Sequence, residues 1–349
     1  MDNKESRKLN VGIIGYGGRG TLHTVIVNLN PKAEVKAICD TNKKLIGFLN
    51  NLGITEGLYD DLERMLKEVE LDAVYICTPN STHLPIAKKC IEKNLHIFSE
   101  IPIADSYNSA KKMLDAAEKN NIIHSSGDYI PYQKTFEMAK HNLSKNILDR
   151  IIRVRASLYW SVLPYPDDIY LDKDKSDSGV IINLGSWLFL LLQWLFGPTK
   201  SLYAQATARS SHAEESSSII LNFANGMQGY CDVSLNRPGF PCPTVNIIVE
   251  GTRGIMEISS DFLKLHMYKK TGDFNKGWTI IHQADLPSKS DLYIVEEGYY
   301  EASSSFIRNC LENNKPKFSW KESLDALKIV EATYISLKEK KVIKLEEVK

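Results

Sequence analysis

Short apolar runs alternate with amphipathic stretches through the first third of the chain. Residues 11, 13 and 14 are apolar, and residues 22, 25, 26 and 29 then recur at the spacing of one helix face. Short apolar strands separated by helices are typical of a parallel sheet covered on both faces. The pattern therefore predicts an α/β fold that begins with a doubly wound parallel sheet, whose ligands bind where the strands end. The predicted strands are 11–14, 35–39, 73–77, 95–99 and 121–124.

Two helices between these strands have predicted N-caps. Asp60 and Asp105 each precede an amphipathic stretch, and an aspartate at that position can accept from the free N–H groups of the first turn.

The period changes near residue 150. From 152 to 158 apolar and polar side chains alternate, which indicates a strand with one face in water. Asn225-Gly226 is a strong hairpin signal, and an amphipathic stretch near 321–338 predicts a closing helix. We predict a dinucleotide-binding (Rossmann) domain at 1–126 and an α+β domain with a largely antiparallel open sheet at 127–349. The further predicted strands are 217–223, 227–235, 244–250, 255–259 and 263–268.

The turn after the first predicted strand has the sequence of a dinucleotide site. Residues 15–20 read Gly-Tyr-Gly-Gly-Arg-Gly, the G-x-G-x-x-G pattern, and lie between a strand and a helix. Glycine permits the backbone angles of such a turn and the close approach of a diphosphate, and free N–H groups at the helix start favour an anion. The predicted contacts are Gly15, Tyr16, Gly17, Gly18, Arg19 and Gly20.

The second predicted strand ends in an acid that bears on the choice of cofactor. Asp40 follows the last glycine by about 20 residues, where a carboxylate accepts from ribose hydroxyl groups. It would repel the 2′-phosphate of NADP, so we predict NAD, although Lys43 and Lys44 just beyond it favour NADP.

The ends of the predicted strands 73–77 and 95–99 are also expected to line the cofactor crevice. Glu100 is expected to contact the nicotinamide ribose. His83 has two interpretations, as a cofactor contact or as a helix-start residue bonded to the backbone. The predicted cofactor contacts from these strand ends are Cys77, Thr78, Pro79, Asn80, His83 and Glu100.

Composition excludes several classes of protein. Lys plus Arg and Asp plus Glu are both 43, so no net field attracts nucleic acid or an anionic membrane. The six cysteines form no C-x-x-C pair, which favours reduced thiols in a cytoplasmic protein over a disulfide framework or a metal site. The first residues lack the apolar core of a signal peptide, and the apolar run 187–196 is far short of the ~20 residues of a membrane span.

The chain resembles the Gfo/Idh/MocA family, which includes glucose–fructose oxidoreductase and inositol dehydrogenase, over nearly its whole length. The resemblance implies an NAD-binding first domain, an α/β second domain with an open sheet, a small-molecule site between the domains, and homodimers or homotetramers through the sheet face. The matching stretches are 11–20, Cys77-Thr-Pro-Asn-Ser-Thr-His83, Phe98-Ser-Glu-Ile-Pro102, Ser178-Gly-Val-Ile-Ile-Asn-Leu-Gly-Ser-Trp187 and 318–345.

The same resemblance shows that the family's proton chemistry is altered. Ile101 stands where the family has a lysine, and Asn183 and Trp187 stand where it has an aspartate and a histidine. Hydride transfer to or from an alcohol needs a group that takes or gives the proton on oxygen. Isoleucine, asparagine and tryptophan cannot do this near neutral pH.

Other residues must then take part if the chain is an enzyme. Tyr129 and His124 are the leading candidate proton donors, and Asn183 and Trp187 remain candidate substrate contacts. The full set of candidate replacements and substrate contacts is His124, Tyr129, Tyr132, Tyr159, Trp160, Tyr165, Asn183 and Trp187.

Three functions are compatible with this sequence. The first is an NAD-dependent oxidoreductase of a sugar-like or other cyclic alcohol or carbonyl compound, with an atypical proton relay. The second is a catalytically silent NAD-binding sensor or assembly protein, since one branch of the family acts in gene regulation. The third is a lyase or hydrolase that uses NAD transiently.

Overall fold

The computed structural model describes residues 7–52, 57–161, 179–208, 213–287 and 297–348. The chain forms two compact units, one made of 1–129 and 292–324 and the other of 130–291 and 325–349. The predicted boundary after residue 126 lies close to the point where the chain first leaves the first unit. The return of 292–324 to that unit was not predicted from the sequence.

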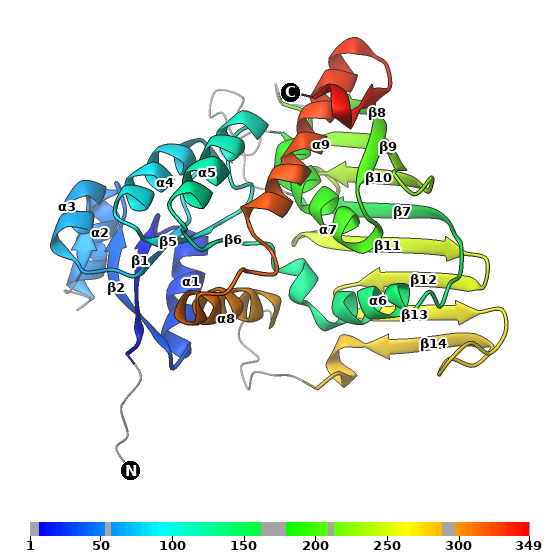
Figure 1. Cartoon of the computed structure of the whole chain (residues 1–349), viewed down its shortest axis with the longest axis horizontal. Coiled ribbons are helices and arrows are strands. Elements are labelled where there is room, and N and C mark those ends of the chain that lie inside the picture. The colour runs from blue at the N-terminus through cyan, green and yellow to red at the C-terminus, as the bar shows by residue number, and fades with distance from the viewer. Residues whose placement is uncertain (1–6, 53–56, 162–178, 209–212, 288–296, 349) are drawn as a thin grey trace. The chain divides into compact units, whose positions relative to one another are not determined.

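The first unit contains a six-stranded parallel sheet with the order β3-β2-β1-β4-β5-β6 (Figure 1). The order reverses at β1, between β2 and β4, and this reversal is where open α/β sheets bind ligands. The predicted parallel sheet is therefore confirmed. Its strands are β1 (Leu9–Ile14), β2 (Ala33–Cys39), β3 (Leu58–Tyr59), β4 (Ala73–Ile76), β5 (His96–Ser99) and β6 (His124–Ser126). Its helices are α1 (Gly18–Leu29), α2 (Lys43–Asn51), α3 (Leu62–Glu68), α4 (His83–Glu92), α5 (Tyr107–Lys119) and α8 (Glu297–Glu312).

Two predicted helix caps are displaced by one residue. Asp61 Oδ1 accepts from the backbone N–H of Arg64 at 2.7 Å, so Asp61 is the N-cap of α3. Ser106 Oγ accepts from the backbone N–H of Ser109 at 3.2 Å and caps α5. The predictions of Asp60 and Asp105 were wrong because α3 begins at Leu62 and α5 at Tyr107, and the N-cap is the residue directly before the helix.

The second unit contains a nine-stranded sheet with the order β14-β13-β12-β11-β7-β10-β9-β8-β15. Only the pairing of β10 with β7 is parallel among the described strand pairs of this sheet, so the prediction of a largely antiparallel sheet is confirmed. The predicted hairpin is present between β9 and β10, where Gly226 has a φ of +84°. The strands are β7 (Ile151–Tyr159), β8 (Thr199–Thr207), β9 (Ser216–Phe223), β10 (Gln228–Ser234), β11 (Thr244–Gly251), β12 (Gly254–Ser259), β13 (Phe262–Met267), β14 (Gly277–His282) and β15 (Ile343–Lys344).

Helices cover one face of this sheet. Helix α6 (Lys134–Ser144) packs on β12 and β13, and α7 (Ser186–Phe196) packs on β7 (Figure 1). The closing helix α9 (Trp320–Glu339) matches the predicted range and spans the division between the units. On the other face, strand neighbours Ile220 and Tyr230 leave 48% and 44% of their surface exposed.

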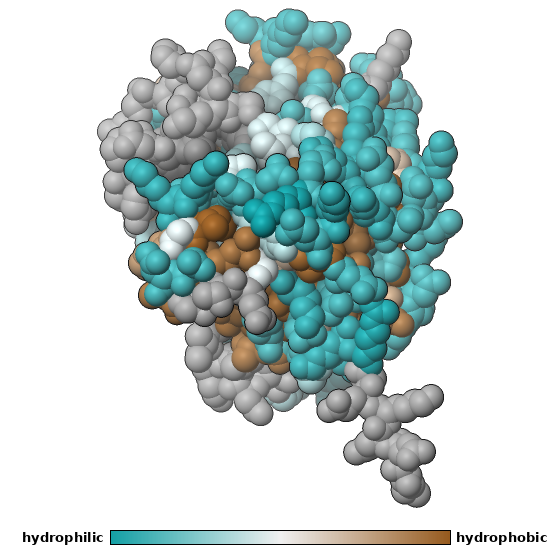
Figure 2. Space-filling model, turned by 90° about the vertical axis from the view of Figure 1, so that its left-hand side faces the viewer, coloured by the Kyte–Doolittle hydropathy of each residue, from teal (hydrophilic) through white to brown (hydrophobic). Residues whose placement is uncertain are grey.

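The surface in view in Figure 2 is mostly hydrophilic, with hydrophobic residues in small patches between polar ones. Among the described residues, no helix combines the length and the apolar character that a membrane crossing requires. The most apolar helix, α7, has 11 residues and is almost wholly buried against its own unit.

Candidate functional site

At two positions the turn between β1 and α1 leaves no space for a side chain, so glycine is required there. Gly15 has a φ of +87°, and a Cβ there would lie 2.9 Å from the backbone carbonyl of Cys77. A Cβ on Gly20 would lie 2.0 Å from the carbonyl oxygen of Gly15. These two glycines therefore let the turn close against β4 and against itself.

The other two glycines of the motif face open space. A Cβ on Gly17 or Gly18 would meet no protein atom within 4 Å, and both residues are exposed. No side chain caps α1 at Gly17, so the N–H groups of its first turn are left for an anion. Open glycines at an uncapped helix start fit a dinucleotide diphosphate, with its charge on the positive end of the helix dipole.

Asp40 lies just after β2 and is bonded to the glycine turn. Its Oδ2 accepts from the backbone N–H of Tyr16 at 2.7 Å, and its Oδ1 accepts from the backbone N–H of Asn42 at 2.8 Å. Each carboxylate oxygen keeps a lone pair for a further donor. This position and charge fit the hydroxyl groups of an adenosine ribose.

The loop after β4 carries the next group of predicted contacts. Cys77 and Thr78 are half-buried, Pro79 is exposed and Asn80 is buried. Burial raises the pKa of the Cys77 thiol well above its usual value, so it stays a neutral thiol. The buried Oδ1 of Asn80 has no hydrogen-bond partner among the described residues, and such an acceptor fits a ligand donor.

His83 joins two strand-end loops through backbone carbonyl groups. Its Nε2 lies 2.8 Å from the carbonyl oxygen of Thr78, and its Nδ1 lies 3.1 Å from that of Ile103. The ring is 1% exposed. Of the two interpretations from the sequence, the structure therefore favours the bond to the backbone.

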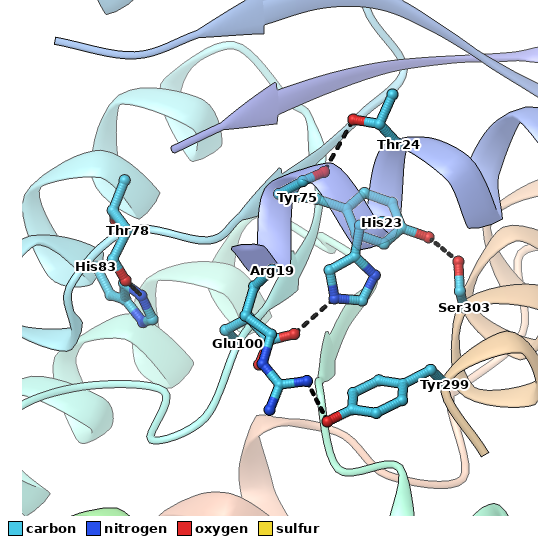
Figure 3. Close-up of polar contacts among 10 residues, drawn as sticks. Arg19, His23, Thr24, Tyr75, Thr78, His83, Glu100, Tyr299 and Ser303 are labelled. Atoms are coloured by element: carbon cyan, nitrogen blue, oxygen red, sulfur yellow. Dashed lines mark hydrogen bonds and ion pairs between the residues drawn. The ribbon is translucent and has the colours of Figure 1, made fainter. Parts of the chain in front are cut away.

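Glu100, directly after β5, is held by a buried polar cluster (Figure 3). Its Oε1 lies 2.6 Å from Nε2 of His23, and its Oε2 lies 4.0 Å from Nε of Arg19. Burial raises the pKa of the Glu100 carboxyl, but the His23 hydrogen bond and the charge of Arg19 outweigh it, and the pKa lies below its ordinary value. Glu100 is thus a carboxylate near neutral pH and not a proton donor.

Arg19 also contacts an aromatic pair next to Glu100. It donates to Tyr299 Oη, and its guanidinium carbon lies 4.8 Å from the centre of the Tyr299 ring. Tyr129 stacks on Tyr299 with ring centres 3.9 Å apart and an angle of 16°. Tyr299 comes from α8, in the returning segment of the first unit.

Asp128 is a buried acid near the end of β6. Its Oδ2 accepts from Ser126 Oγ at 2.7 Å and from Ser323 Oγ at 3.4 Å. Burial raises the pKa of the Asp128 carboxyl to about 7, helped by the charges of Glu100 and Glu322 and opposed by the two serine hydroxyls. It therefore gains or loses a proton near neutral pH.

Sequence reasoning missed three members of this cluster, His23, Asp128 and Tyr299. His23 had a recognisable signal, because it lies with Gly20, Ile26 and Val27 on the buried face of α1. A polar residue on such a face needs a buried partner.

The other sequence candidates of the first unit do not carry proton chemistry in this arrangement. His124 accepts at Nδ1 from the backbone N–H of Trp320 at 3.1 Å and stacks on that ring at 4.9 Å. Burial, with a smaller effect of Lys315, lowers the pKa of His124 to about 4, so it is neutral at pH 7. Ile101 has no ionisable group.

Asn183 and Trp187 lie at the start of the apolar helix in the second unit. Residues Ile181–Gly185 form a π-helical turn that runs into α7, so the four-residue spacing does not follow a regular α-helical face. Asn183 Nδ2 donates to the carbonyl oxygen of Gly179 at 2.9 Å, and Trp187 is 8% exposed. π-helical turns within helices are frequent at functional sites.

The structure does not bring Tyr159 to the helix that carries Trp187. Tyr159 lies on the outer face of the sheet, where its hydroxyl donates to Asp232 Oδ2 at 2.7 Å. Helix α7 packs on the opposite face. Trp160 Nε1 donates to the carbonyl oxygen of Pro241 at 3.2 Å.

Two remaining candidates add little. Tyr132 is buried in the second unit, and Tyr165 lies outside the described residues. Among the described residues, no three His, Cys, Asp or Glu side chains are grouped so as to hold a metal ion.

Relatives of known activity cover nearly the whole chain. Myo-inositol 2-dehydrogenase from Thermotoga maritima is 23% identical over 353 residues, which span 97% of this chain and 99% of that protein. D-apiose dehydrogenase from Paraburkholderia graminis is 24% identical over 323 residues, spanning 90% and 84% of the two chains.

Solved structures share the fold at low identity. A levoglucosan dehydrogenase in complex with NADH and levoglucosan superposes with a TM-score of 0.87 at 20% identity, and the match covers 98% of this chain and 100% of that one. The enzyme GenD2 from gentamicin A biosynthesis, in complex with NAD, gives 0.80 at 21% identity over 97% and 96% of the chains.

Family models match both parts of the chain. Residues 9–127 match the oxidoreductase family with an NAD-binding Rossmann fold, and residues 136–257 match the C-terminal domain of the same family. Together with the open glycine turn and Asp40, these matches confirm the predicted family, fold and cofactor. The chain belongs to the Gfo/Idh/MocA oxidoreductase family.

Proposed function

We propose that this protein is an NAD-dependent dehydrogenase of a sugar-like or cyclic polyol, with an atypical proton relay in place of the family's lysine. The observation that carries the proposal is the open glycine turn, in which Gly17 and Gly18 leave space at an uncapped helix start while Asp40 holds the turn. The relatives act on myo-inositol and D-apiose, according to their names, which supports a polyhydroxylated substrate.

Each part of the first unit has a role in this proposal. Gly17 and Gly18 bind the diphosphate, Asp40 accepts from the adenosine ribose, and Glu100 accepts from the nicotinamide ribose. NAD, when bound, supplies the hydride acceptor. Tyr129 Oη would take the proton from the substrate oxygen as a phenolate, a charge that the nearby guanidinium of Arg19 would stabilise.

The second unit supplies substrate contacts in the same proposal. The indole of Trp187 stacks on a sugar face, and the amide of Asn183 hydrogen-bonds a hydroxyl group. In this proposal Asn183 and Trp187 bind the substrate and take no part in proton transfer.

A silent NAD-binding protein is the second candidate function. It is favoured by one observation, that Ile101, Asn183 and Trp187 together remove the ionisable groups on which the family's chemistry rests. General acid–base assistance contributes roughly 10²–10⁴-fold in rate, so its loss would leave binding without useful turnover.

One experiment separates the two candidates. Purified protein is tested for co-purified NAD(H) and then screened with cyclitols, pentoses and anhydrosugars for NADH formation at 340 nm. We expect turnover that falls by a hundredfold or more in Tyr129→Phe (roughly the range of acid–base assistance) with NADH affinity unchanged. Tight NADH binding without turnover on any substrate would instead support the silent protein.

We also propose that the protein is a homo-oligomer formed through the outer face of the nine-stranded sheet. Strand neighbours Ile220 and Tyr230 are exposed there, and Trp278 on β14 is 58% exposed. Ile220→Glu should reduce the particle mass measured by light scattering, and an unchanged mass would exclude this face.

The six cysteines are all free, which supports a reducing compartment such as the cytoplasm.

A further inference from the structure

The two oxygens of Glu100 have different surroundings. Oε1 is bonded to His23 Nε2 at 2.6 Å. Oε2 lies 4.0 Å from Arg19 Nε, beyond hydrogen-bond distance, and accepts no hydrogen bond within the described part of the chain. The residue is 7% exposed. Oε2 is thus the oxygen that remains for an outside donor.

His23 is fixed as a hydrogen-bond donor. Its ring is fully buried, 5.2 Å from the ring of Tyr75 and 5.1 Å from that of Phe98. Because Nε2 faces a carboxylate, it must carry the proton. Nδ1 is buried without a hydrogen-bond partner among the described residues. An unsatisfied buried nitrogen lowers the stability of the fold, so the ring is held in this place at a cost in stability.

The other side of Glu100 is closed by backbone. Gly127 has no side chain, and a Cβ there would lie 3.2 Å from Glu100 Oε1 and 3.3 Å from Glu100 Cα. The carboxylate therefore lies between His23, Arg19 and the backbone of Gly127, with little freedom to rotate.

We propose that His23 is a positioning residue which, with Arg19, holds Glu100 as a fixed carboxylate so that Oε2 accepts from a ribose hydroxyl of the nicotinamide half of NAD. This inference rests on the proposed function, and it assigns His23 no contact with cofactor or substrate. The hydrogen bond from His23 restricts rotation of the Glu100 carboxylate before NAD binds, and such preorganisation increases the affinity for NAD.

The test compares variants of the full-length protein by NADH affinity, measured through nucleotide fluorescence, and by thermal unfolding. His23→Phe keeps an aromatic ring and removes the donor, and His23→Gln restores a donor amide. Tyr75→Phe is the matched control, because it removes a buried hydroxyl, bonded to Ser303 Oγ at 2.7 Å, from the same aromatic cluster without touching Glu100.

We expect His23→Phe to weaken NADH binding roughly tenfold or more, the value of a hydrogen bond to a charged group. His23→Gln should recover part of the loss, and Tyr75→Phe should leave the affinity unchanged. Glu100→Gln should weaken binding as well, and His23→Phe in that background should add nothing, since both changes act on one contact. Gly127→Ala, which displaces Glu100 without altering His23, should also weaken binding.

Contrary results distinguish this inference from the proposed function. Affinity retained in His23→Phe but lost in Glu100→Gln would overturn the positioning role alone. Affinity retained in Glu100→Gln would overturn the ribose contact of Glu100 and this inference with it. Wild-type protein that binds no NADH would overturn the proposed function itself.

Discussion

Asp40 Oδ2 accepts a hydrogen bond from the backbone N–H of Tyr16 at 2.7 Å, so the acid at the end of β2 is tied to the turn that begins α1. The Asp40 side chain thus has two roles in the proposed site: its charge bears on the choice between NAD and NADP, and its hydrogen bond fixes the turn. In the proposed site, the carboxylate expected to disfavour a 2′-phosphate also fixes the first residues of the turn that would bind the diphosphate. Variants at this position must therefore be chosen so that the two effects separate.

Asp40→Asn and Asp40→Ala are expected to differ. Asparagine keeps one oxygen for the Tyr16 N–H but removes the negative charge and turns its amide nitrogen, a donor, toward the Asn42 N–H, so NADPH affinity should rise relative to NADH at a cost in stability of about 1 kcal/mol. Alanine also leaves the Tyr16 N–H without its acceptor, which should lower stability by about 1 kcal/mol more. Fluorescence titration with both nucleotides and thermal unfolding measure these effects. An unchanged nucleotide preference in Asp40→Asn would remove Asp40 from its assigned role.

Asp128 should make the folded protein less stable as pH rises. Its pKa is raised by burial from 3.8 to about 7, so between these values the unfolded chain has lost the proton that the folded chain keeps. The stability it contributes is present below pH 4 and is lost as pH rises toward and through 7. The loss is at most ~4 kcal/mol by the usual conversion. Urea unfolding from pH 4.5 to 8 should show Asp128→Asn gaining stability relative to the wild type as pH rises. A constant difference would contradict the raised pKa.

His124 should make the folded protein less stable as pH falls, the opposite of the effect of Asp128. Burial lowers its pKa from 6.5 to about 4, so the unfolded chain binds a proton that the folded chain refuses. The resulting stability is present above pH 6.5 and is lost as pH falls toward 4, by at most ~3 kcal/mol. His124→Phe keeps the stack on Trp320 but loses the acceptor for its backbone N–H. Its deficit relative to the wild type should shrink as pH falls, and a deficit that is the same at pH 4.5 and pH 7.5 would show that His124 does not titrate in this way.

The features predicted best from the sequence are those specified by a short stretch of residues. The strand, glycine turn and acid of 11–40 identified a dinucleotide fold because each device is local: the turn needs glycine, and the acid must follow at the end of the next strand. The turn at Asn225-Gly226 was predicted for the same reason, since it needs a residue with a positive φ, and Gly226 supplies it. Helix caps predicted at 60 and 105 were each wrong by one residue, because two adjacent polar residues precede each helix and the sequence pattern does not tell which of them is the cap.

What could not be predicted depends on contacts between distant segments. Tyr299 joins Arg19 only because 292–324 returns to the first unit, and no local pattern specifies such a return. Asp128 titrates near neutrality because of its burial, and burial of a single polar residue beside a strand end cannot be read from periodicity. The π-helical turn at Ile181–Gly185 also has no simple sequence pattern.

The substitution Gly17→Ala tests the diphosphate site with little effect on the fold. Gly17 has a φ of −76°, which alanine adopts readily, and a Cβ there meets no protein atom within 4 Å. The methyl group would instead occupy the space that a diphosphate needs against the helix start, so NADH affinity should fall by roughly tenfold or more while thermal stability is unchanged. Gly47→Ala is the matched control, since Gly47 lies within α2 with nothing within 4 Å of its Cβ position. It should raise stability by about 0.5–1 kcal/mol and leave NADH affinity as it was. Because the two variants add the same methyl group to open space, a loss of affinity confined to Gly17→Ala would place the diphosphate at this turn, and equal affinities in both would mean that NADH binds elsewhere.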